Sequence, residues 1–169
     1  MADYKEWYEK VSSPWREKPQ RVKLLNILNH GLVLFMYLVY PFLLFYAYRQ
    51  QGNIFSPLLL KLVLIPGISF VLVSLARKWI NRKRPYETWD IHPLIAKDKK
   101  GESMPSRHVF SEAVISMAWL YVCPPFGIFL LAASLLGAAI RVIGGVHYPT
   151  DVAAGYVLGV MAGLLLWMV

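Results

Sequence analysis

Residues 24–48 read LLNILNHGLVLFMYLVYPFLLFYAY, a stretch that contains no Lys, Arg, Asp or Glu. An α-helix rises about 1.5 Å per residue, so a helix of this length exceeds the ~30 Å hydrocarbon core of a bilayer. The stretch therefore predicts a membrane-spanning helix, and the rest of the chain can be compared with it.

The composition of the whole chain agrees with a membrane protein. Of its 169 residues, 57% are hydrophobic and 17% are charged, and the mean hydropathy is +0.44. Soluble domains average roughly 45–50% apolar and about 25% charged residues. These values exclude a disordered chain, a collagen-like chain and an ordinary soluble enzyme. The length suits one membrane-embedded domain over residues 1–169, and the single Cys123 excludes a disulfide within the chain and a multi-cysteine zinc site.

Four further apolar runs follow the first one. They extend over Ile54–Leu75, Val109–Cys123, Phe126–Val142 and Pro149–Val169. Together the runs predict an all-α polytopic bundle with about five spanning helices. Because successive spans cross in opposite directions, we expect the loops 77–104 and 143–148 on the same membrane face. Gly155, Gly159 and Gly163 form a stripe of small residues that predicts close helix packing within the chain.

The polar segment 1–23 precedes the first span. It mixes both signs of charge with the aromatic residues Trp7, Tyr8 and Trp15. Aromatic rings favour the headgroup level of a bilayer, so the segment predicts an interfacial amphipathic helix. The alternative is a solvated and partly frayed tail.

The net charge of +8 limits the partners of the chain. A basic balance favours nucleic acid, anionic lipid or a phosphorylated substrate. Apolar stretches make up most of this chain, which disfavours nucleic acid. We therefore expect the lipid bilayer and a lipid phosphate as partners.

Three polar clusters lie at the ends of the expected spans, on the face with the loops. They are Arg77–Pro85 (RKWINRKRP), Pro105–His108 (PSRH) and Arg141–Asp151 (RVIGGVHYPTD). Ionisable side chains are costly at membrane depth, so several that converge at one level indicate a functional site. The loop 77–104 is long enough to be a functional loop, and we expect it to form part of that site.

The residue types in these clusters suit phosphoryl transfer. His147 and Asp151 are four residues apart at the start of an expected helix, so both should lie on one face of it. A carboxylate beside an imidazole fixes its tautomer, which suits a histidine nucleophile. His108 is placed to act as the general acid for a leaving oxygen. Side chains that fork onto or donate to phosphate oxygens complete the set. These candidate phosphate ligands are Arg77 or Lys78, Arg84, Ser106, Arg107 and Arg141.

In this order, the motifs resemble the type 2 phosphatidic acid phosphatase superfamily, the lipid phosphate phosphatases. Its signature is Lys-x6-Arg-Pro, then Pro-Ser-Gly-His, then Ser-Arg-x5-His-x3-Asp. The matching positions here are Arg84-Pro85, Pro105-Ser106-x-His108 and Arg141-x5-His147-x3-Asp151. The resemblance implies a phosphatase that uses no metal and no cofactor. It also implies a phospho-histidine intermediate on His147, with Asp151 as its partner and His108 as the acid.

The chain departs from that signature at a few positions. The lysine of the first motif corresponds to Arg77 by spacing and to Lys78 by residue type, and spacing favours Arg77. Arg107 replaces a glycine and Ile140 replaces a serine. The family commonly has six spans, against about five here.

Glu112, His30 and His92 are ionisable residues outside the signature. Glu112 follows His108 by four residues, so it can reach the imidazole, or else pair with another basic residue near the site. His30 and His92 are expected to be structural or solvated.

The charge distribution and the family resemblance predict opposite orientations of the protein in the membrane. Sixteen of the 18 Lys and Arg residues lie on the face with the loops, which by the positive-inside rule would be cytoplasmic. The resemblance implies catalysis on the opposite side. We expect an integral protein of the bacterial cell membrane with an extracytoplasmic site.

Three classes of function are compatible with these residues. The first is a lipid phosphatase acting on undecaprenyl diphosphate, phosphatidylglycerol phosphate or phosphatidic acid. The second is a non-catalytic binder of anionic lipid or a transporter subunit, which would not need His108, His147 and Asp151. The third is a metal-dependent transferase, which needs clustered Asp residues for magnesium that the sequence lacks.

Overall fold

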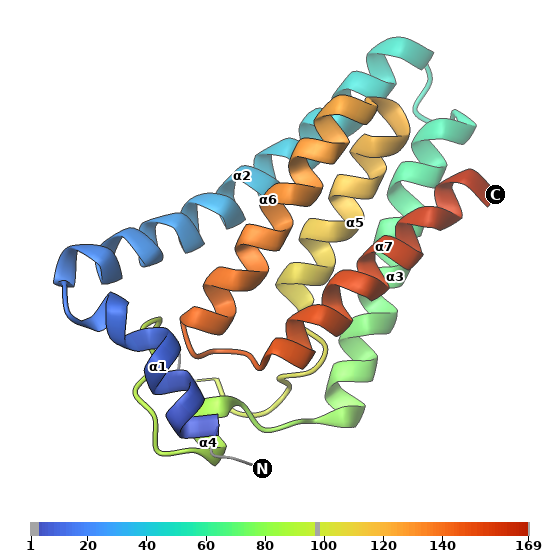
Figure 1. Ribbon diagram of the computed structural model, residues 1–169. Helices are drawn as coiled ribbons and strands as arrows, with labels where there is room; N and C mark the ends of the chain where they lie inside the picture. Colours follow the sequence, from blue (N-terminus) through green and yellow to red (C-terminus); the bar gives the residue numbers. More distant parts are fainter. Residues whose placement is uncertain (1–3, 97–98, 169) are drawn as a thin grey trace.

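The computed structural model of the protein describes residues 4–96 and 99–168, and their regular structure is entirely helical. The helices are α1 (Tyr4–Arg16), α2 (Pro19–Gln51), α3 (Pro57–Ile80), α4 (Pro85–Thr88), α5 (Arg107–Val122), α6 (Pro124–Ile143) and α7 (Pro149–Met168). The long helices form one bundle, with α1 and α4 at one end of it (Figure 1). The prediction of an all-α polytopic bundle is confirmed.

The number of helices that meet the length of a membrane span is four among the described residues, not five. These are α2, α3, α6 and α7. The expected third span is α5, which has only 16 residues and is about 24 Å long. It packs mainly against α6 and α7, inside the bundle. A helix surrounded by other helices does not need to match the full thickness of the bilayer.

The helix ends explain where the loops begin. Gly52 closes α2 with φ of 65°, and Ser56 opens α3 by accepting a hydrogen bond from the backbone N–H of Leu59. Asn81 closes α3 in the left-handed region with φ of 41°. The loop predicted over 77–104 therefore begins only at Asn81, because Arg77 belongs to the last turn of α3. It also contains the short helix α4.

The N-terminal helix α1 packs against the polar end of the bundle (Figure 1). It ends at Arg16, so the last residues of the segment predicted over 1–23 belong to α2. Tyr8 is fully buried, and its hydroxyl donates to the carbonyl oxygen of Ile143 over 3.1 Å. The guanidinium of Arg16 donates to the carbonyl oxygen of His92. Helix α1 is thus part of the folded structure and not a solvated tail.

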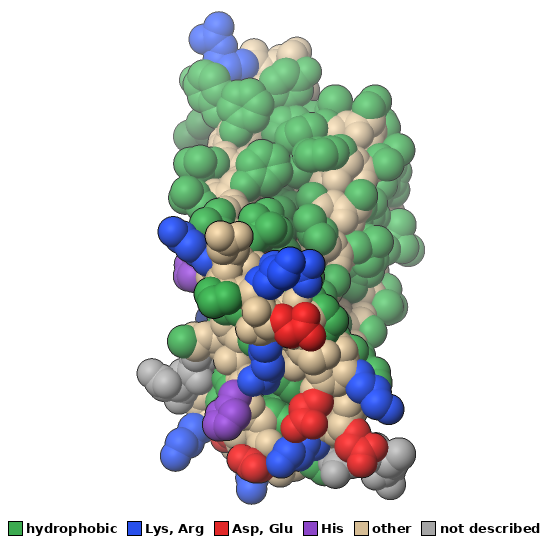
Figure 2. All heavy atoms as spheres, turned by 60° about the vertical axis from the view of Figure 1, so that its left-hand side comes forward, with side chains coloured by type: hydrophobic (Ala, Val, Ile, Leu, Met, Phe, Trp, Pro, Cys, Tyr) green, Lys and Arg blue, Asp and Glu red, His purple; other side chains and the backbone are tan. Residues whose placement is uncertain are grey.

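The surface divides into an apolar part and a polar end. Exposed large apolar side chains follow the helices, including Leu38 and Phe45 on α2, Leu72 on α3 and Leu135 on α6. Figure 2 shows them above a belt where charged side chains gather at one end. Such a surface is stable only when lipid covers it. The protein is an integral membrane protein.

Close packing of α7 against α5 joins the beginnings of these two helices. Gly155, Gly159 and Gly163 are buried, which confirms the predicted packing stripe within the chain. A Cβ atom on Gly155 would lie 2.5 Å from the carbonyl oxygen of Ser106, so only glycine permits this approach. The backbone N–H of Ser106 donates to the carbonyl oxygen of Asp151 over 2.9 Å. The second and third polar clusters are therefore held together.

Candidate active site

The three polar clusters of the sequence meet at the polar end of the bundle. The backbone N–H of Leu94 donates to the carbonyl oxygen of Gly144 over 3.1 Å. The Arg84 guanidinium donates to the carbonyl oxygen of Val146 over 3.0 Å. The two loops expected on one face thus contact each other directly.

His147 and Asp151 are neighbours, although not in the way that their spacing suggested. His147 precedes α7, which begins at Pro149, so the pair does not share a helix face. Asp151 lies in the first turn, where its Oδ2 accepts the backbone N–H of Tyr148 over 3.0 Å. His147 Nδ1 lies 3.6 Å from that same Oδ2. The turn before α7, and not a helical repeat, brings them together.

Ser103 is part of this group, and the sequence motifs did not identify it. Its hydroxyl donates to Asp151 Oδ2 over 2.5 Å and lies 3.4 Å from His147 Nδ1. All three side chains are at most 1% exposed. The acidic group of Asp151 and the hydroxyl of Ser103 therefore both lie on the Nδ1 side of the imidazole.

Arg82 is a second residue that the sequence analysis missed. Its Nη1 lies 2.8 Å from Asp151 Oδ1 and donates to the Thr150 hydroxyl over 2.8 Å. Its guanidinium also lies 4.3 Å from the centre of the Tyr148 ring, which Tyr4 of α1 contacts edge-on at 4.9 Å. The only signal in the sequence is its place two residues before Arg84, on the same side of an extended segment.

Burial controls the protonation of His147. Removal from water lowers the pKa of its imidazole to about 4, and the charge of Arg84 acts in the same direction. The nearby carboxylate of Asp151, whose Oδ2 lies 3.6 Å from Nδ1, opposes this lowering of the pKa. The imidazole is therefore neutral at pH 7, which is the form that can act as a nucleophile.

Buried arginines surround this group. Arg77, Arg84 and Arg141 are 4%, 1% and 4% exposed. Arg77 donates to the carbonyl oxygens of Pro105 and Glu102, and Arg84 Nε donates to that of Gly101 over 3.1 Å. Arg141 Nε is buried and has no hydrogen-bond partner among the described residues. Arg77 and Arg84 are thus held by backbone carbonyl oxygens, and the unpartnered Nε of Arg141 leaves donor capacity for binding an anion.

The remaining candidates for phosphate binding have different surroundings. Lys78 is exposed, whereas Arg77, the choice favoured by spacing, is buried. Ser106 precedes α5, and its buried hydroxyl has no partner within the described chain. The Arg107 guanidinium lies 5.4 Å from the centre of the Phe70 ring on α3. Ile140 packs in an apolar cluster with Leu25, Ile95 and Val146, which accounts for an apolar residue at this position.

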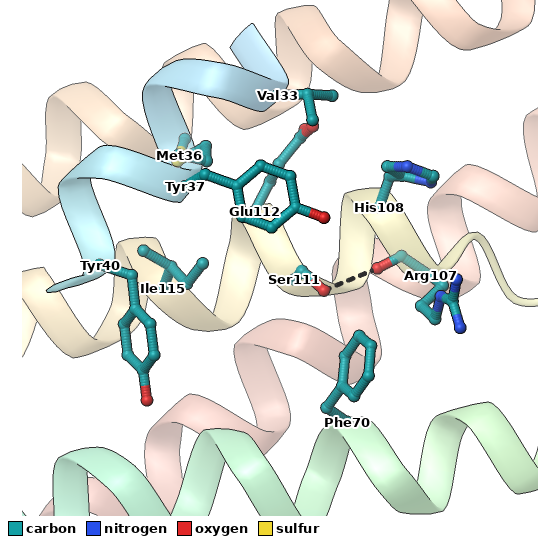
Figure 3. A pocket seen from close by; sticks show the side chains of 10 residues that line it. All are labelled: Val33, Met36, Tyr37, Tyr40, Phe70, Arg107, His108, Ser111, Glu112 and Ile115. Atoms are coloured by element: carbon teal, nitrogen blue, oxygen red, sulfur yellow. Dashed lines mark hydrogen bonds between the residues drawn. The ribbon is translucent and has the colours of Figure 1, made fainter.

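His108 lies in the first turn of α5 and lines two adjoining pockets. The polar-end pocket, about 730 Å³, has His108, Arg141 and Val146 on one side and Asn29 and His30 of α2 on the other. The lateral pocket, about 210 Å³, extends from His108 between α2, α3 and α5 (Figure 3). His30 therefore lies at a pocket wall, and His92 is exposed.

A comparison with known protein families identifies the family of this chain. The model of the PAP2 superfamily matches residues 58–169, which is more than half of the chain. The chain belongs to the PAP2 superfamily. The family resemblance inferred from the motifs is thus confirmed.

Known members of the superfamily agree with this assignment. A lipid A 1-phosphatase from Rhizobium johnstonii is 30% identical over 101 residues, covering 57% of this chain and 41% of the relative. This chain thus matches less than half of the length of that relative.

Two solved structures share the PAP2 fold seen here. Aquifex aeolicus LpxE superposes with a TM-score of 0.74 at 21% identity, covering 97% of this chain and 94% of the other. A PAP2-type phosphatidylglycerolphosphate phosphatase from Bacillus subtilis gives a TM-score of 0.68 at 23% identity, covering 99% and 86%. The Rhizobium johnstonii relative is named as a phosphatase, which supports the prediction of a phosphatase, and the two solved structures show that the fold is shared.

Proposed function

We propose that this protein is a lipid phosphatase of the PAP2 type that needs no metal and works through a phospho-histidine intermediate. The observation that carries the proposal is the neutral, buried His147 beside Asp151, with three buried arginines around it. A site that only bound phosphate would need the arginines and not a nucleophile. The adjoining lateral pocket lies among membrane helices, which suits a substrate held in the bilayer.

The proposed reaction has two steps. His147 Nε2 attacks phosphorus, the bond from phosphorus to the lipid oxygen breaks, and His108 gives its proton to that oxygen. Water then attacks the phospho-histidine while His108 takes up a proton, and the nitrogen–phosphorus bond breaks. The products are a lipid alcohol, or a lipid monophosphate from a diphosphate, and inorganic phosphate.

The buried cations would stabilise the charge that develops on the phosphoryl oxygens. Backbone carbonyl oxygens already hold Arg77 and Arg84, so these two need no reorganisation during the reaction, and the buried Arg141 adds a third cation. The unpartnered Ser106 hydroxyl adds a further donor. Arg107 contributes at longer range, because its guanidinium lies over Phe70.

We assign the protein to the bacterial cell membrane with its polar end extracytoplasmic. The candidate substrates remain undecaprenyl diphosphate, phosphatidylglycerol phosphate and phosphatidic acid. The named activities of the relatives favour a phosphate carried on a bacterial lipid.

The test is phosphate release by purified protein in detergent with EDTA, using these three lipids. We expect release from at least one lipid in EDTA and none from His147→Ala. Release that stops in EDTA would contradict the metal-free mechanism. Saturable lipid binding without any release would favour the non-catalytic binder instead.

A further inference from the structure

The lateral pocket contains one acidic side chain that the proposed reaction does not use. Glu112 on α5 lines this pocket together with His108, Ser111 and Tyr37 (Figure 3). It is only 4% exposed, and its Oε2 has no hydrogen-bond partner among the described residues. A buried carboxylate oxygen without a partner is costly, so Glu112 has unused capacity to accept a hydrogen bond.

The neighbouring helix leaves room for this carboxylate. A Cβ atom on Gly137 of α6 would lie 2.3 Å from Glu112 Oε2, so any larger residue would displace the carboxylate. Arg141, one turn further along α6, attracts Glu112 electrostatically but makes no ion pair with it within 4.0 Å among the described residues. The Glu112 carboxylate therefore fits beside Gly137, and its Oε2 forms neither a hydrogen bond nor an ion pair with the described residues.

The depth of Glu112 selects the part of a lipid that it can contact. It follows His108 by four residues, which is about 6 Å along the helix axis away from the polar end. Helical side chains lean toward the N-terminus, so the carboxylate comes closer to His108 than the Cα separation suggests. The phosphate itself is repelled by a carboxylate. With the phosphate bound at His108 and His147, the part of a lipid that would reach this level is the linker that joins the phosphate to the lipid tails.

We propose that Glu112 is a specificity-determining residue that accepts a hydrogen bond from the linker of the lipid substrate. This inference rests on the proposed function, because it assumes a lipid phosphate bound at His108 and His147. The favoured substrate class carries a hydroxyl or amide N–H within a few bonds of the phosphate. Polyprenyl diphosphates and diacylglycerol phosphate have no such donor in their linkers. With these lipids bound, the Glu112 carboxylate would remain without a hydrogen-bond donor.

The experiment compares two lipids that differ only in this donor. One is a single-chain glycerol phosphate lipid with a free hydroxyl at C2, and the other is its 2-deoxy analogue. For the unaltered protein we expect at least a tenfold higher kcat/KM for the hydroxyl lipid, because a site built for a hydrogen bond rejects the analogue that lacks it. In Glu112→Ala the two values should agree within about twofold, with the loss confined to the hydroxyl lipid.

Two further variants keep the test decisive if Glu112→Ala folds poorly. Gly137→Ala moves the carboxylate without removing it and should reduce the preference for the hydroxyl lipid. Glu6→Gln removes the same charge from an exposed position on α1 and should leave the preference unchanged. Thermal unfolding of each variant in detergent checks that the fold persists.

Binding separates this proposal from the proposed function. The affinities of the same two lipids for His147→Gln, measured by thermal stabilisation, give the preference without turnover. If the protein binds the hydroxyl lipid more tightly but the unaltered protein releases no phosphate, the role of Glu112 is supported and the phosphatase function is contradicted. Phosphate release without a preference, or an equal loss for both lipids in Glu112→Ala, would overturn the role of Glu112.

Discussion

The two ends of the helical bundle differ in whether their arginine side chains are buried or exposed. At the polar end Arg77 and Arg84 are almost completely buried, and backbone carbonyl oxygens hold their guanidinium groups. At the other end Arg49 is exposed in the last turn of α2, where a cation is favourable near the helix C-terminus. Water screens the attraction between a solvated cation and an anion, whereas a buried and fixed cation attracts a bound anion much more strongly. Burial, and not charge as such, distinguishes the candidate site.

The largest contrast between the two ends should appear when the nucleophile is removed. His147→Gln should lower kcat by about 10³-fold or more, because the remaining groups can bind phosphate but cannot form the intermediate. Arg49→Gln at the opposite end should change kcat by less than about twofold. Phosphate release measures both variants. Comparable losses in the two would show that catalysis does not reside at the polar end.

Replacing a buried cation should affect both activity and stability. Arg84→Gln leaves the carbonyl oxygens of the buried Val146 and the half-buried Gly101 without their donor, which costs about 1–3 kcal/mol for the buried group. It should also lower kcat/KM by about 10²-fold. Thermal unfolding and phosphate release report the two effects. The matched control is Lys83→Gln, the exposed neighbour, and an equal effect there would contradict the distinction by burial.

A smaller loss is expected for the residue that supports Asp151. Arg82→Ala removes the 2.8 Å contact with Asp151 Oδ1 from a partly exposed position. The imidazole of His147 would then be held less firmly, and we expect about a tenfold lower kcat with KM little changed. Steady-state kinetics separate the two parameters. A rise in KM alone would mean that Arg82 binds substrate directly.

The smallest effect at neutral pH, but a diagnostic one, is the titration of His147. The NMR signal that disappears in His147→Gln should titrate at about pH 4, and Arg84→Gln should raise that pKa because a nearby positive charge is removed. The ordinary pKa of 6.5 applies to the unfolded chain, which therefore binds this proton first as pH falls. The free energy of unfolding should therefore decrease as the pH is lowered from about 6.5 to about 4. A midpoint near 6.5 in the folded protein would show that the imidazole is solvated.

Much of the fold could be read from the sequence because membrane helices carry a strong local signal. The apolar runs correspond to α2, α3, α5, α6 and α7, and the Gly155 stripe indicated the packing of α7. The helix boundaries were less predictable. Arg77 belongs to α3 because Asn81, and not the end of the apolar run, terminates that helix. The short α5 is acceptable because other helices surround it.

The candidate site was predictable where the residues follow a fixed spacing and not where they meet through folding. His108, His147 and Arg141 could be placed in one site from their motifs. Ser103 and Arg82 could not, since each reaches Asp151 across 48 and 69 residues of chain. No local pattern records a contact over such a separation. Glu112 is intermediate: its position on α5 was evident, whereas its pocket and its unpaired oxygen were not.

The membrane class and the helical architecture follow from the amino-acid sequence because they depend on local hydropathy, and the order of residue types along the chain predicts the candidate site. The folded arrangement of helices and loops establishes which cations are buried, which nitrogen of His147 lies beside Asp151 and what lines the pockets around His108. Desolvation and hydrogen-bond geometry are properties of three-dimensional packing. A residue acquires them from neighbours that may be distant in sequence, such as the α6 glycine that leaves space for Glu112.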